Sequence, residues 1–164
     1  MAAEIEIIKV CGEAGYETET VVAEVGLKSV DDATTPVADA PITIPAAGTN
    51  YSYESWLRFR LKVAPSNKCD NFKIWSNGSP IATGVVATIN TSAVTTYSTP
   101  VNTQSTQGTR DNFANHDSSN KISVGGTLIN VGDKTDFMVF QLEVSSSASP
   151  GDISFTCYYS YDEQ

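Results

Sequence analysis

The residues of this chain that could do chemistry are few and widely spaced. His116, the only histidine, lies in Asn115-His116-Asp117 within a segment rich in Ser, Thr and Asn. A hydrolytic triad needs a nucleophile within hydrogen-bond reach of a firmly held base, and a polar loop holds such a base poorly. The G-x-S-x-G nucleophile elbow does not occur. We therefore expect an exposed loop histidine rather than a catalytic base.

Paired carboxylates would suit a glycosidase, in which an acid and a base flank the scissile bond at a set separation. The acidic residues that could form such a pair are Glu54, Asp70, Glu143 and Asp152. Nothing in the sequence indicates that any two of them converge, and Glu143 falls on the outward face of a predicted strand. We predict that the chain is not an enzyme and uses no cofactor.

Metal and redox sites have equally weak signals. Asp31-Asp32 and Asp133-x-x-Asp136 place oxygen ligands in loops, as calcium prefers, but Asp is also an ordinary turn residue. The three cysteines, Cys11, Cys69 and Cys157, are far apart, odd in number and outside any C-x-x-C pair. We predict turns rather than a metal site, and buried free thiols, with one disulfide as the alternative.

The elements that must position these residues are strands, because apolar and polar residues alternate repeatedly. In 57–63, Leu57, Phe59, Leu61 and Val63 point one way, while Arg58, Arg60 and Lys62 point the other. The same period of two recurs in 138–144 and 153–161. Weaker strand candidates are 5–10, 20–27, 40–44, 72–75, 81–90, 94–97, 122–124 and 127–131.

About ten short strands and no convincing helical stripe predict an all-β chain. Two packed antiparallel sheets would bury one face of each strand, which indicates a jelly-roll-like β-sandwich. We predict one domain spanning 1–164. Two of its segments differ from the rest: an acidic N-terminal segment, 1–40, and a long polar loop or arm, 98–120. Within the arm, Phe113 is one of few bulky residues.

Charge and hydropathy exclude several partners. The formal net charge of −9 argues against nucleic acid, because phosphate repels an acidic surface. No run of eighteen apolar residues is present, so we expect no membrane span. Segment 1–40 holds nine acids against two lysines, whereas Arg58, Arg60 and Lys62 form a basic strand face. Both are typical of solvated surfaces, but could also pair neighbouring subunits.

Exposed aromatic residues offer the best signal for binding. Alternation places Trp75 on the outside if Phe72 and Ile74 face inward. Flat aromatic rings stack on sugars in carbohydrate-binding β-sandwich modules, and they also anchor protein interfaces. We favour the interface interpretation and predict Arg58, Arg60, Lys62, Trp75 and Phe113 as contact residues.

The order of features from Tyr51 onward supports a resemblance to one kind of protein. Tyr51–Leu61 leads through Pro65 to Asn71–Gly78, then to Tyr97–Val101 and the polar arm, and ends in 136–142 and 159–163. This arrangement resembles small β-sandwich virion proteins of tailed bacteriophages that decorate or cement the head.

The resemblance implies a structural protein bound to the major capsid protein or to other virion proteins. It implies a homo-oligomer, with a trimer as one form, located in the virion and made in the host cytoplasm. The absence of a basic region followed by an apolar one at the start of the chain agrees with an expectation of no signal peptide. A carbohydrate-binding module is the alternative function.

Overall fold

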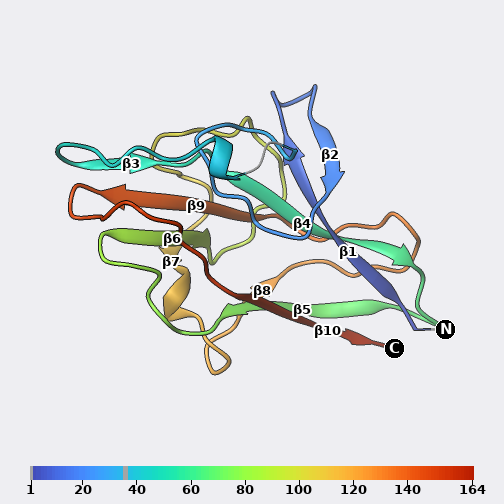
Figure 1. Ribbon diagram of the computed structural model, residues 1–164. Helices are drawn as coiled ribbons and strands as arrows, with labels where there is room; N and C mark the ends of the chain where they lie inside the picture. The colour runs from blue at the N-terminus through green and yellow to red at the C-terminus, as the bar shows by residue number, and fades with distance from the viewer. Residues whose placement is uncertain (1, 35–36) are drawn as a thin grey trace.

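The computed structural model describes residues 2–34 and 37–164, and within these ranges it contains ten strands, two short 3-10 helices and no α-helix (Figure 1). The strands are β1 (Glu4–Cys11), β2 (Thr18–Val21), β3 (Thr49–Tyr51), β4 (Ser55–Val63), β5 (Cys69–Ser76), β6 (Val85–Asn90), β7 (Arg110–Asn112), β8 (Ile122–Val124), β9 (Met138–Ser145) and β10 (Cys157–Glu163). The 3-10 helices are η1 (Val37–Asp39) and η2 (Phe113–Asn115).

The strands form two antiparallel sheets of unequal width. The seven-stranded sheet has the order β2-β1-β4-β9-β6-β7, with β3 also paired to β9, and the three-stranded sheet has the order β10-β5-β8. Together they form one all-β sandwich domain, which confirms the predicted fold class. The jelly-roll-like arrangement within that class stays a prediction.

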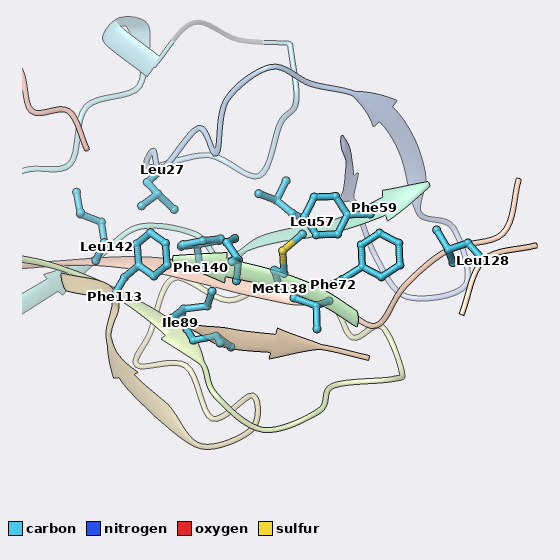
Figure 2. Close-up of a cluster of buried hydrophobic side chains, with 14 of the residues drawn as sticks. Leu27, Leu57, Phe59, Phe72, Ile89, Phe113, Leu128, Met138, Phe140 and Leu142 are labelled. Carbon is cyan, nitrogen blue, oxygen red and sulfur yellow. The ribbon is translucent and has the colours of Figure 1, made fainter. Parts of the chain in front are cut away.

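Alternation along the central strands builds the main core between the sheets (Figure 2). Phe59 of β4 stacks on Phe72 of β5 with ring centroids 5.5 Å apart, and so joins one sheet to the other. Phe140 of β9 makes an edge contact with Phe113, at 5.1 Å between centroids. Burying a side chain of this size stabilises the fold by about 1.5–3 kcal/mol.

Part of the second face of the wider sheet is buried as well, although Lys62 at the end of the same face is exposed. Trp56 and Val139, which are paired across β4 and β9, point away from the main core and are fully buried. The segment from Val94 to Tyr97 covers them, with the rings of Trp56 and Tyr97 5.1 Å apart. This face therefore carries a small second core, which explains why 94–97 resembles a strand in sequence although the structure forms none there.

Several predicted strands differ in extent from those observed. Residues 40–44 and 127–131 form no strand, although Leu128 of the latter makes an isolated bridge to Cys69. Residues 153–156 also lie outside β10, despite their alternating pattern. Strands β3 and β7, which pair at sheet edges, were not predicted. Two residues of the predicted acidic segment, Thr35 and Pro36, and also Met1, lie outside the described residues.

The polar loop 98–120 is folded onto its own domain. Ser105 is buried and donates its backbone N–H to Gln141 Oε1 at 2.8 Å. Farther along, residues 110–112 form the edge strand β7, which pairs with β6, and η2 follows directly. The loop is therefore the cover of the wider sheet's outer face.

Candidate binding surface and cavity

The outer face of the three-stranded sheet carries a row of three side chains, Tyr158, Trp75 and Lys121, which we call the cross-strand row. Tyr158 pairs with Trp75 across β10 and β5, and their rings stack with centroids 5.9 Å apart and planes 19° apart. The ammonium of Lys121 lies 4.0 Å from the centroid of the Trp75 ring. Because β10 and β8 flank β5 on opposite sides, Trp75 is enclosed between an aromatic ring and a cation.

This face differs from the outer face of the wider sheet because it is open. Tyr158 is 44 % exposed, Trp75 is half-buried, and Asn71 and Asp162 are exposed. Polar contacts continue beside the row, since Lys73 donates to Ser123 Oγ at 2.7 Å and Asn71 Nδ2 donates to Asp162 Oδ2 at 2.8 Å. Aromatic rings among charged and amide groups are a composition found at protein interfaces.

The structure explains why Trp75 faces outward as predicted. Phe72 and Ile74 are buried in the main core, and β5 alternates strictly from Phe72 to Ser76. A residue between two inward-facing neighbours must point outward. Tyr158 and Lys121 were not predicted as contact residues. The alternation in 153–161 does place Tyr158 on the face opposite Phe155 and Cys157, whereas Lys121 required the β5–β8 register.

The basic strand face predicted for contacts is neutralised within the chain. Antiparallel pairing of β1 with β4 sets Glu6 beside Arg60, whose side chains form an ion pair at 2.6 Å. Lys62 pairs with Glu4 at 3.0 Å. Arg58 contacts Glu19 of β2, and its guanidinium also lies 4.5 Å from the Phe137 ring centroid. The acidic and basic segments therefore complement each other inside one subunit.

The prediction that Phe113 is a contact residue at the surface is wrong, because its side chain is buried. The structure places it in the main core at 1 % exposure, in edge contact with Phe140 and with Phe155. A hydrophobic residue in a polar loop suggested an exposed anchor. In the folded chain the turn of η2 directs the ring back between the sheets, so Phe113 holds the loop to its own domain.

His116 also lies in a different environment from the one predicted. It is 8 % exposed, with Nε2 3.0 Å from Asp111 Oδ2 and Nδ1 3.1 Å from the Asn120 carbonyl oxygen. Both ring nitrogens thus have partners inside the loop. Its own carbonyl accepts from the Ser76 backbone N–H at 2.7 Å. This histidine fastens the loop to the end of β5.

The acidic residues considered for catalysis or metal binding are dispersed. Glu54 is buried at 1 % exposure, where its Oε2 accepts from Trp56 Nε1 at 3.0 Å. Asp133 Oδ2 accepts from the backbone N–H groups of Ile129 and Asn130, each at 2.8 Å, and these bonds lower its pKa. Among residues 2–34 and 37–164, three or more His, Cys, Asp or Glu side chains nowhere gather at metal-binding distance.

The three cysteines are free thiols, as predicted. Burial raises the pKa of Cys157 to about 12, because the apolar surroundings disfavour the thiolate. Burial and the nearby Asp31 carboxylate raise that of Cys11 to about 12 as well. Low thiolate content makes both sulfurs poor nucleophiles.

A mainly apolar cavity of about 490 Å³ opens between the two sheets. Leu57, Met138 and Phe140 of the wider sheet line it from one side, and Ile74 lines it from the narrower sheet. Most of its remaining lining comes from 23–27 and 153–157, and the rest comes from Ile7, Val37, Leu142 and Tyr159. The cavity exists because three strands are too few to cover the inner face of a seven-stranded sheet. Its volume is in the range of ordinary ligand sites.

None of the elements in the described part of the chain is a helix with the length and hydropathy needed to span a membrane. No family model, curated protein or solved structure matches the chain.

Proposed function

We propose that this chain is a non-enzymatic structural protein of a virion, which binds the capsid protein or another virion protein through the outer face of its three-stranded sheet. The observation that supports the proposal is the cross-strand row, because an ordered Trp, Tyr and Lys remain at the surface, whereas the aromatic Trp56 on the outer face of the other sheet is covered. The resemblance of the sequence from Tyr51 onward points to the same class of protein.

The arrangement of the row favours a protein partner. Tyr158 and Trp75 are held by each other and by Lys121, so little side-chain entropy is lost when a partner covers them. Aromatic and charged groups fixed in this way are the usual centres of binding energy in protein interfaces. In a particle with many copies, modest single contacts add up to stable attachment.

A carbohydrate-binding module is the second candidate, and exposed Tyr158 favours it. A sugar ring needs a free aromatic face to stack on. The Trp75 ring is already engaged, since it stacks with Tyr158 and the Lys121 ammonium lies 4.0 Å from its centroid. Sugar binding would therefore depend on Tyr158, and a glycan array probed with the native chain and with Tyr158→Ala separates this function from protein binding.

The decisive experiment is particle association. The chain and its variants are expressed in bacterial cells that are producing tailed-phage particles. The particles are purified by density gradient, and quantitative mass spectrometry measures how many copies of the chain they carry. We expect the native chain in the particle band at a fixed copy number. Trp75→Ala and Tyr158→Ala should each lower its occupancy at least fivefold, which corresponds to about 1 kcal/mol at the interface.

Tyr16→Ala is the matched control. Tyr16 is 84 % exposed in the turn between β1 and β2, so its removal takes an exposed tyrosine from a surface outside the row. This variant should associate like the native chain. If the native chain is missing from the particles, or if all three variants associate equally well, the proposed function is wrong.

A further inference from the structure

The connection that leads into β10 lacks the backbone partners of a strand. Residues 153–161 alternate like one continuous strand, but pairing with β5 begins only at Cys157, which is opposite Ser76 at the end of β5. Between 150–156 and the other residues that the structure describes, no backbone–backbone hydrogen bond forms. Such a segment is a ready template for pairing with another chain.

The apolar cavity lies directly beside this segment. Ile153, Phe155 and Cys157 line it, as do Val25 and Leu27 across the opening. The segment 23–27 is also free of backbone–backbone hydrogen bonds in the structure. In this segment the Val25 carbonyl accepts from Ser55 Oγ and the Gly26 carbonyl accepts from Lys9 Nζ at 3.2 Å. The cavity thus has an apolar floor beside 152–156, the stretch of backbone with the greater remaining hydrogen-bonding capacity.

These features identify the class of occupant. A small apolar molecule could fill the floor, but it would leave the exposed N–H and C=O groups of 152–156 hydrogen-bonded to water alone. An extended polypeptide satisfies both requirements at once, because its backbone pairs with the edge while every second side chain enters the cavity.

The acidic residues around the cavity indicate the charge of the occupant. Glu24 lines the cavity, and exposed Asp152 adjoins its wall, whereas neither Lys nor Arg is among the lining residues. The chain as a whole carries a net charge of −9, so a second copy would bring like charge to this opening. A partner segment with Lys or Arg beside its apolar residues complements it.

We propose that residues 152–156 accept an extended segment of a partner protein by β-strand addition, with alternate apolar side chains of that segment filling the cavity and basic residues flanking them. The proposal deepens the proposed function and rests on it, because it assumes that the chain works by binding proteins. It uses a surface separate from the cross-strand row.

The test uses defined peptides and the full chain labelled for NMR. The probes have Lys at both ends and Thr at alternate positions, with Val, Ile, Leu or Phe at the other positions, for example Ac-Lys-Val-Thr-Val-Thr-Val-Lys-NH2. We expect at least one to bind with a Kd tighter than about 1 mM. Binding should protect the amides of 152–156 from hydrogen exchange. Two further peptides carry N-methyl groups, one at the apolar positions and the other at the Thr positions. Alternate N–H groups of a strand point to opposite edges, so only one of the two peptides should lose binding.

Charge is tested with a matched pair of variants. Glu24→Lys should weaken binding of the basic peptide about fivefold at low salt. Glu13→Lys, an equal charge change in the β1–β2 turn, should leave it unchanged. Equal effects of the two variants would mean that only net charge matters, and would contradict the proposal.

Three further outcomes overturn the inference. One is that no probe peptide binds. Another is that sodium decanoate fills the cavity while the peptides do not, which indicates a small apolar ligand. The last is that 152–156 becomes protected as the chain dimerises with rising concentration, which indicates a second copy. Particle association through Trp75 and Tyr158 is measured in a separate experiment. A failure of peptide binding would therefore contradict this inference without contradicting the proposed function, and the reverse also holds.

Discussion

Gln141 of β9 and Ser105 of the polar loop are joined by a hydrogen bond of 2.8 Å from the Ser105 backbone N–H to Gln141 Oε1. The amide Nε2 of the same glutamine donates to the carbonyl oxygens of Ser52 at 3.0 Å and Thr103 at 2.8 Å. Gln141 is completely buried. One side chain on the wider sheet therefore anchors both the start of β4 and the loop that covers the sheet.

Gln141→Leu replaces the amide by an apolar side chain one atom shorter and removes all of these bonds. Buried backbone groups left without partners cost about 1–3 kcal/mol each if the site does not rearrange. We expect the free energy of unfolding, measured by urea denaturation, to fall by about 2–3 kcal/mol. Hydrogen exchange should rise most at 103–107. Gln104→Leu, at an exposed loop position, should change neither quantity.

Glu19 links stability to pH. Burial would raise its pKa, but hydrogen bonds from Lys134 and Arg58 outweigh this and hold the pKa below the ordinary value of 4.5. A lowered pKa means that its stabilising contribution is complete above the unfolded value and is lost as pH falls through the folded value. Glu19→Gln should lower the free energy of unfolding at pH 7 by about 1 kcal/mol. The difference between native and variant chains should shrink between pH 5 and pH 3, and a constant difference would contradict this role.

Phe113 and Trp75, both predicted from sequence as contact residues, should differ sharply in their effect on stability. Phe113→Ala leaves a cavity in the main core and should cost about 3–5 kcal/mol. Trp75→Ala removes only a surface stack and should cost about 0.5–1.5 kcal/mol. Thermal unfolding followed by circular dichroism measures both. An equal loss would mean that Trp75 belongs to the folding core.

Cys157 should be inert in the native chain. Its pKa is raised from 9.0 to about 12, which lowers the thiolate fraction at pH 8 by about a thousandfold. We expect negligible reaction with iodoacetamide over an hour, and complete reaction in 6 M guanidinium. Mass spectrometry of peptides gives the extent for each of the three cysteines. Fast labelling of native Cys157 would show that the cavity wall opens in solution.

Local sequence identified the central strands of both sheets correctly. The alternation Leu57, Phe59, Leu61 reports which side of β4 is buried between the sheets, and that pattern needs no knowledge of partners. The outward position of Trp75 followed from the same rule. For residues facing the other way the rule fails in part, because Gln141 and Trp56 point outward from the sandwich and are nevertheless fully buried. The loop 98–120 covers Gln141, and the segment 94–97 covers Trp56.

The sequence by itself determined that the chain is an all-β sandwich, because a period of two in polarity is a property of each strand alone. The tertiary structure alone decided which charges meet, which loop covers which face, and where backbone remains unpaired. Glu6 reaches Arg60, and Tyr158 reaches Trp75, only through pairing of strands that are distant along the chain. Such pairing depends on how the sheets assemble as a whole, and no local pattern records it.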